Sequence, residues 1–569
     1  MVEDRLQQTI DRCRRQLAQH DGDWATWLKL GDALQAQRGN PARFSIGMAC
    51  YRRALQINAD SPEAWVRLGS LFKLLGQRQE SLAALQRAQE LEPGMVSARF
   101  ALLAAYCPVL YEREGDINGV RADYAGQLAT LNRDVPLDTP EQIERAAEAV
   151  GIYPFHLAYQ GHNDCMLQQV YGQLVCRIQA ARYPQWSGRL PPPPRKDGEP
   201  LRIGVVSGFF RNHATWNFPV RGLLSALDRK RFALYGYHTG SRNDRHTDLA
   251  REACTRFVEG DFSLESLCRR ILADRLHLLL YPEIGMNRLV IRLSALRLAP
   301  VQCVSWGHST TSGLPTMDYF LSSDLMEPED GVEHYSERLV RVPHLGVYYP
   351  PPAIETVEVS RQELGIKDDA VLYLCLQSLF KYLPRYDELF PRIALKTGDC
   401  QFVFLIGNQS TPVVDIFRRR LADAFARHGL KSEEFVLFLP YLDDRRYYSL
   451  YRCADVFLDS IGWSGCNTTM DAVARELPVV TLPGSLMRGR QSMAILTRMG
   501  VTETIATSMD DYVRIAVRLG TDLVWRKEIV ERMATCKQRL YDDRESIDYL
   551  ERFFEVAVAD TEQRWATGA

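Results

Sequence analysis

One stretch of the chain decides the fold: Leu458-Asp459-Ser460-Ile461-Gly462-Trp463-Ser464-Gly465-Cys466-Asn467-Thr468-Thr469-Met470-Asp471. An apolar run ends at Leu458, glycines and small polar residues follow, and a helical pattern begins near Asn467. A buried strand that turns through a glycine-containing loop into a helix is the building unit of a doubly wound parallel sheet. The stretch therefore predicts an α/β domain with its ligand site at the carboxyl end of this strand.

The same alternation of strand and helix extends in both directions from this stretch. In the C-terminal part, strands are expected at residues 371–375, 401–406, 435–439, 456–458 and 479–481. Nearer the middle of the chain they are expected at residues 201–207, 232–237, 276–281 and 301–306, with a helix at 263–274. Two Rossmann-like domains in series predict a cleft between them, lined by the loops that follow the strands.

A helical repeat precedes the α/β part. Residues 62–93 read as one tetratricopeptide unit of two helices, and an earlier copy lies upstream. The first helices are 38 residues apart and the second helices 34, which predicts a four-residue insertion near residues 38–41. Equivalent positions in the two copies are Trp27, Gly31, Tyr51 and Ala54, then Trp65, Gly69, Leu85 and Ala88.

We expect the repeats to continue from Ala98 and to form a superhelix over residues 1–183, because a repeat needs stacked neighbours to bury its faces. A plain bundle of amphipathic helices is the alternative. The arm either holds a polypeptide on its concave surface or acts as a spacer or homodimer contact. Four consecutive prolines, residues 191–194, indicate a linker over residues 184–200.

The composition excludes several classes of protein. Apolar residues make up 46% and charged residues 25%, a globular balance. The formal net charge of −2 favours neither nucleic acid nor an anionic membrane. The longest apolar runs are too short to span a bilayer, and the first residues lack the apolar core of a signal peptide. The thirteen cysteines form no CxxC pair and have no zinc-ligand spacing with histidine, which predicts reduced thiols in a cytoplasmic protein.

The start of the helix near Asn467 is the candidate binding site. The Thr468 and Thr469 hydroxyls and the free backbone N–H groups of a helix N-terminus suit a diphosphate. Asp471, one turn further on, is placed to accept hydrogen bonds from ribose hydroxyls. The alternative is that Asn467 and Thr468 simply cap the helix.

These residues resemble the nucleotide-binding stretch of the protein O-linked N-acetylglucosamine transferase family, and the chain is similar to a bacterial homologue of that family. The resemblance covers the whole α/β part, and a repeat arm precedes it as in the family. It implies the GT-B architecture, with residues 201–365 as the acceptor-side domain and residues 366–569 as the nucleotide-side domain with C-terminal helices. The segments that carry it, in chain order, are 210–213, 300–302, 311–313, 317–319, 378–381, 459–471, 478–484 and 519–523.

The resemblance also implies site roles. Lys381 would neutralise the charge that grows on the departing diphosphate. His213 would act as general base or orient the sugar or the acceptor, two roles that the sequence leaves equal. Leu442 matches the loop whose backbone faces uracil. The remaining residues implied to touch the UDP-sugar are Ser378, Cys466, Asn467, Thr468, Thr469 and Asp471, with His308 and Arg490 as lesser candidates.

The implied reaction is inverting, metal-independent transfer of N-acetylglucosamine from UDP-GlcNAc to Ser or Thr hydroxyls of proteins held by the repeat arm. No cofactor or metal is expected, since Lys381 and the helix N-terminus serve instead. Several positions depart from the family pattern, among them Ser309, Asp444 and Cys466. These departures keep two alternatives open: a soluble transferase that uses UDP-glucose or modifies Asn, and an interaction scaffold that binds UDP with little turnover.

Overall fold

The computed structural model describes residues 2–37, 42–352, 359–407 and 409–568. They form two compact units. The first holds the described residues of Met1–Val109, with Asn118–His156 and Ser410–Val413. The second holds Leu110–Ile117 and the described residues of Leu157–Gln409 and Val414–Ala569. Among the described residues, no helix is both long enough and apolar enough to cross a membrane.

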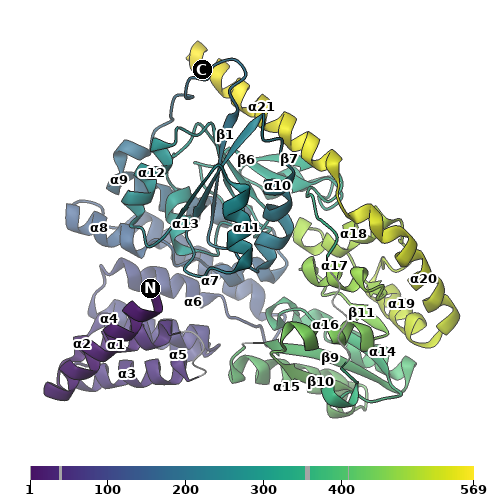
Figure 1. The fold of residues 1–569 in the computed structure, drawn as a ribbon. Helices are drawn as coiled ribbons and strands as arrows, with labels where there is room; N and C mark the ends of the chain where they lie inside the picture. Colours follow the sequence, from purple (N-terminus) through teal and green to yellow (C-terminus); the bar gives the residue numbers. More distant parts are fainter. Residues whose placement is uncertain (1, 38–41, 353–358, 408, 569) are drawn as a thin grey trace. The chain divides into compact units, whose positions relative to one another are not determined.

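The first unit is helical (Figure 1). Its helices are α1 (Val2–Gln19), α2 (Trp24–Ala36), α3 (Arg43–Ile57), α4 (Pro62–Leu74), α5 (Arg78–Leu91), α6 (Val96–Tyr106), α7 (Asp116–Asp134) and α8 (Pro140–Ala149), of which α7 begins in the second unit. The pairs α2–α3 and α4–α5 are the two expected repeats. The insertion expected at residues 38–41 lies outside the described residues.

Equivalent residues of the two repeats make equivalent contacts. The Trp27 indole donates to the carbonyl of Asp21 at 2.9 Å, and the Trp65 indole donates to the carbonyl of Ala59 at 2.9 Å. A methyl group on Gly31 would lie 2.5 Å from the Tyr51 ring, and one on Gly69 would lie 2.6 Å from Leu85. Glycine therefore recurs because the paired helices approach too closely for a side chain.

The second unit contains two parallel sheets. The first has the order β3-β2-β1-β4-β5-β6-β7. Its strands are β1 (Leu201–Ser207), β2 (Phe232–His238), β3 (Arg256–Glu259), β4 (Leu278–Tyr281), β5 (Val301–Ser305), β6 (Tyr319–Ser323) and β7 (Arg338–Val342). The sequence patterns predicted four of these strands and missed β3, β6 and β7. The accompanying helices are α10 (Arg221–Ala226), α11 (Arg245–Ala253), α12 (Leu264–Ala273) and α13 (Arg288–Ser294).

The second sheet has the order β10-β9-β8-β11-β12. Its strands are β8 (Val371–Cys375), β9 (Cys400–Gly407), β10 (Val436–Pro440), β11 (Val456–Leu458) and β12 (Val479–Val480), at all five predicted places. Its helices are α14 (Leu389–Thr397), α15 (Thr411–Arg427), α16 (Asp444–Cys453), α17 (Asn467–Ala474), α18 (Gln491–Met499), α19 (Met509–Thr521) and α20 (Leu523–Cys536). Repeat helices followed by two doubly wound sheets confirm the expected fold class.

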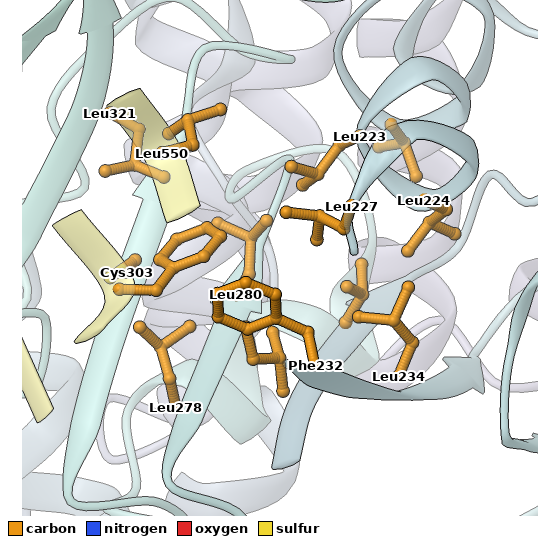
Figure 2. Close-up of a cluster of buried hydrophobic side chains, with 14 of the residues drawn as sticks. Leu223, Leu224, Leu227, Phe232, Leu234, Leu278, Leu280, Cys303, Leu321 and Leu550 are labelled. Atoms are coloured by element: carbon orange, nitrogen blue, oxygen red, sulfur yellow. The ribbon is translucent and has the colours of Figure 1, made fainter. Parts of the chain in front are cut away.

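The last helix, α21 (Arg544–Thr567), returns to the first sheet and runs alongside it (Figure 1). Its Ile547, Leu550 and Phe554 belong to one buried cluster with residues of α10, β1, β2 and β4. Figure 2 shows Leu550 in this cluster with Leu321 of β6 and Leu280 of β4. The sequence analysis grouped this helix with residues 366–569, but its apolar face completes the core of the first sheet.

Helix α9 (Cys165–Arg182) also lies in the second unit, although the sequence analysis placed residues up to 183 in the repeats. It packs backbone to backbone against the turn at residues 311–313. A methyl group on Gly172 would lie 2.0 Å from the carbonyl oxygen of Gly313, and Gly313 itself has φ +70°. Trp186, near the start of the expected linker, is buried and stacked on Tyr183, the residue just before the linker.

Candidate functional site

The loop between β11 and α17 is folded by one buried carboxylate. Asp459 is 3% exposed. It accepts hydrogen bonds from the Gly465 N–H at 2.6 Å, from the Ser464 hydroxyl at 2.6 Å and from the Thr481 hydroxyl at 2.8 Å. Buried polar groups must find such partners, so these bonds fix the loop and direct the chain into α17.

The N-terminus of α17 has no side-chain cap. Cys466 occupies the N-cap position and makes no capping hydrogen bond, and Asn467 is already the first residue of the helix. The capping interpretation of Asn467 and Thr468 is therefore wrong. The first backbone N–H groups have no partner within the helix, and the helix dipole makes this end favourable for an anion.

Lys381 lies beside this helix end. It ends the short turn η6 (Leu379–Lys381) that follows β8. Its ammonium donates to Gln377 Oε1 at 2.8 Å and to the Ser464 carbonyl at 3.4 Å, and the Gln377 amide donates to the Thr468 hydroxyl. Burial lowers the pKa of Lys381 to about 8, although the negative charge of Asp459 opposes the change. A cation and an uncapped helix N-terminus therefore meet at one point.

Asp471 lies one turn into α17. Its carboxylate is 3.8 Å from Arg475, and the Tyr447 hydroxyl donates to it at 3.5 Å. Burial raises the pKa of Asp471 to about 6; Arg475 acts against this and the nearby Asp444 adds to it. Asp444, where the family has a lysine, is exposed in the first turn of α16, where a negative charge stabilises the helix. Leu442 is partly exposed in the loop just before helix α16.

The other residues implied to touch the UDP-sugar fall into two groups. Ser378 is exposed beside Lys381, and Cys466 and Asn467 are partly exposed at the start of α17. Thr469 differs, because it is fully buried and its hydroxyl is 2.7 Å from the hydroxyl of Ser492. The sequence analysis paired Thr468 and Thr469 as ligands, whereas the helix turns Thr469 toward the interior of the domain.

His213 lies in another part of the fold, in the loop that follows β1. Its ring stacks on Phe209 with centroids 4.1 Å apart, and its Nδ1 accepts the Thr215 N–H at 3.1 Å. Burial, helped by Arg211, lowers the pKa of His213 to about 4. The imidazole is therefore neutral at pH 7, and since Nδ1 is an acceptor, the proton is on Nε2.

Glu283 supports the same end of β1 and was missed by the sequence analysis. Its carboxyl group is fully buried and accepts the Ser207 hydroxyl at 3.0 Å and the Gly208 N–H at 2.8 Å. Burial raises the pKa of Glu283 to about 8. No sequence pattern marked Glu283, because a glutamate in the Tyr281-Pro282-Glu283 segment looks like an ordinary surface residue.

The two lesser candidates make contacts within the protein, and of the two only His308 is buried. His308 is 3% exposed, its Nδ1 is 3.1 Å from the Thr310 hydroxyl, and burial lowers its pKa to about 3. Arg490 donates to the carbonyls of Met326 at 3.0 Å and Gly484 at 3.4 Å. Carbonyl groups thus bind the Arg490 guanidinium.

An aromatic group lies behind the loop of residues 459–466. Trp463 stacks on Tyr159 with centroids 4.1 Å apart, and Phe380, next to Lys381, meets Tyr159 edge to face at 4.6 Å. The buried Arg488 lies over the Trp463 ring and pairs with Asp164 at 2.9 Å. The contacts of Tyr159 and Asp164 join residues more than 200 positions apart, so sequence patterns could not reveal them.

Within the described residues, no three His, Cys, Asp or Glu side chains are grouped so as to hold a metal ion. All thirteen cysteines lie among the described residues, and none of them forms a disulfide.

Comparison with known proteins gives consistent matches. The family model described as Glycosyl transferase family 41 matches residues 182–348 and 352–548. The probable UDP-N-acetylglucosamine–peptide N-acetylglucosaminyltransferase SPINDLY of Arabidopsis thaliana is 26% identical over 345 residues, 58% of this chain and 36% of the relative. The protein named SEC from the same plant, with the same probable activity, is 22% identical over 430 residues, 71% of this chain and 42% of the relative. The chain thus spans less than half the length of these relatives.

Among solved structures, a mutant O-GlcNAc transferase of Thermobaculum terrenum superposes with a TM-score of 0.69 at 24% identity. The match covers 96% of this chain and 99% of that one, which establishes a common fold.

Proposed function

Because the chain belongs to glycosyltransferase family 41, we propose that it transfers N-acetylglucosamine from UDP-GlcNAc to Ser or Thr hydroxyls of proteins. The names of the plant relatives, each a probable UDP-N-acetylglucosamine–peptide N-acetylglucosaminyltransferase, support this donor and this class of acceptor. We further propose that transfer inverts the anomeric carbon and needs no metal ion.

The observation that carries the proposal is that the Lys381 ammonium lies beside the uncapped N-terminus of α17. Breaking the bond between the sugar and the diphosphate leaves negative charge on the phosphate oxygens. Donors that are already oriented toward this charge stabilise the transition state without reorganisation. Lys381, the Thr468 hydroxyl and the first N–H groups of α17 supply such donors, and Asp471 lies where it can accept the ribose hydroxyls.

His213 takes the orienting role in this proposal. A general base needs an unprotonated nitrogen directed at the acceptor hydroxyl. The Nδ1 lone pair is already used by the Thr215 N–H, and the neutral ring carries its proton on Nε2. His213 therefore acts as a hydrogen-bond donor to the sugar or the acceptor.

The test is release of UDP by the full chain. The purified protein is incubated with UDP-GlcNAc, UDP-glucose or UDP-GalNAc, with chelator and a pool of cell-lysate proteins, and Lys381→Ala is the control. The proposal expects UDP release above the control, a preference for UDP-GlcNAc, and labelled sugar attached to protein through Ser or Thr.

The alternatives predict other outcomes. Preference for UDP-glucose, or label bound to Asn, would replace the donor or the acceptor. Binding of UDP without any release would favour an interaction scaffold, for which the carboxylate of Asp444 near Asp471 is the main argument. Chelator-sensitive turnover would refute the metal-independent mechanism. The cytoplasmic location, acceptor binding by the repeat arm and a homodimer stay predictions.

A further inference from the structure

Gln377 occupies a central position that no motif marked. It lies between β8 and η6, it is 3% exposed, and both ends of its amide are bonded. Its Oε1 accepts from the Lys381 ammonium at 2.8 Å, and its Nε2 donates to the Thr468 hydroxyl oxygen. One amide therefore joins the two side chains that stand at the proposed diphosphate site.

The chemistry of these groups fixes the direction of each hydrogen bond. A lysine ammonium only donates, so the amide must present its oxygen to Lys381. The amide nitrogen then faces Thr468, and an amide nitrogen only donates. The Thr468 oxygen is thus the acceptor in this bond, so the hydroxyl proton of Thr468 points elsewhere and is available to an anion.

The packing around the amide keeps this arrangement in place. A methyl group on Gly465 would lie 2.4 Å from Gln377 Nε2 and 2.6 Å from the Thr468 hydroxyl. Glycine at this position lets the loop close over the amide, and the bonds of Asp459 hold the loop there.

We propose that Gln377 is a positioning residue that aims the Lys381 ammonium and the Thr468 hydroxyl proton at the diphosphate of the donor. The inference rests on the proposed function, since it requires a nucleoside diphosphate at this helix end. It predicts that Gln377 contributes to phosphate recognition and to departure of the diphosphate, with no contribution to recognition of the nucleoside.

The experiment compares UDP with uridine, which lacks the phosphates. Binding to the full chain is measured by calorimetry for UDP and by ligand-observed NMR for uridine. Gln377→Met keeps the length of the side chain and removes both bonds. Gln401→Met is the matched control, because Gln401 is also buried, lies on the neighbouring strand β9 and accepts the Lys367 N–H through its side-chain oxygen, away from Lys381.

We expect Gln377→Met to weaken UDP binding by about 10- to 100-fold, the range for a lost hydrogen bond to a charged group, with uridine binding unchanged. Gln401→Met should leave both affinities unchanged. In a Thr468→Val background, Gln377→Met should lose part of its effect on UDP, because one of the two aimed donors is already absent.

The outcomes separate the two proposals. If the wild-type protein binds uridine but gains nothing from the phosphates, both the proposed function and this inference are overturned. If UDP binds tightly and Gln377→Met keeps that affinity within twofold, only the inference is overturned. Equal losses for uridine and UDP would also overturn it, because a merely structural residue behaves in that way. If the methionine variant fails to fold, Gln377→Glu serves instead and should lose UDP but retain uridine.

Discussion

Replacing Lys381 by methionine should stabilise the fold while it removes transfer. The pKa of Lys381 falls from its ordinary 10.5 to about 8 because the ammonium is desolvated. At ~1.4 kcal/mol per pKa unit, keeping the charged form inside the protein costs roughly 3 kcal/mol of folding free energy. Methionine leaves Gln377 Oε1 without its donor, a loss of about 1 kcal/mol. The variant should therefore be more stable by about 2 kcal/mol at pH 7.

The stability that Lys381→Met gains over wild type should decrease as pH rises above about 8. Below pH 8 both the folded and the unfolded chain hold the Lys381 proton, so the full penalty is present. Between pH 8 and 10.5 the folded protein releases the proton and the unfolded chain keeps it, so wild-type stability rises with pH. The advantage of methionine should shrink over this interval.

Calorimetric melting of the full chain at pH 7 and pH 9.5 measures the effect, with an expected rise of roughly 2–4 °C at pH 7 for Lys381→Met. Lys396→Met is the matched control, because Lys396 is exposed on α14 and should change neither melting temperature. A variant that melts below wild type at pH 7, or that keeps the same advantage at pH 9.5, would refute the desolvation argument.

Further predictions concern acid–base behaviour and packing. The kcat/KM of transfer should fall as pH rises through about 8, because the free enzyme loses the Lys381 charge; a flat profile from pH 7 to 9 would contradict this. His213→Gln, which keeps an N–H near the Nε2 position, should retain much more transfer than His213→Leu, and equal losses of 100-fold or more would favour a base. Glu283 is protonated up to about pH 8 when folded and only to about 4.5 when unfolded, so wild-type stability should fall as pH rises between these values; the melting temperature of Glu283→Gln should gain on wild type over this interval, and parallel curves would disprove it. Gly172→Ala should destabilise by about 3 kcal/mol or more, because its methyl would meet backbone, whereas Gly188→Ala, which meets nothing within 4 Å, should be neutral in the same urea titration.

The sequence determined the parts of the fold that depend on local patterns. Apolar runs such as residues 371–375 and 456–458 become strands β8 and β11, because a strand that is buried on both faces has no polar face to show. The repeat was visible because Gly31 and Gly69 must both admit a close helix. The start of α17 was visible because small residues, an amide and hydroxyls follow a strand.

Strands that depend on their neighbours were missed. β3 and β7 form the two edges of the first sheet, and both contain charged residues, as in Arg256–Glu259 and Arg338–Val342. Their strand conformation comes from pairing with β2 and β6, because short polar segments carry little preference of their own. Helix α21 was expected only as one of the C-terminal helices, and the sheet that its apolar face covers was decided by packing between residues more than 200 positions apart.

The same division holds for the site. Residue type and order predicted Thr468 and Asp471, because a nucleotide needs donors and a carboxylate near the end of a strand, and the resemblance to the transferase family implied Lys381 and His213. Only the tertiary structure decided which atoms face which. In the folded chain the Thr469 hydroxyl is hydrogen-bonded to the Ser492 hydroxyl, and the His213 proton is on Nε2. Gln377 lies between Lys381 and Thr468. Local sequence sets which residues of a helix or strand are buried. The hydrogen-bond partner of a buried polar group is often distant in sequence, so only the folded chain determines it.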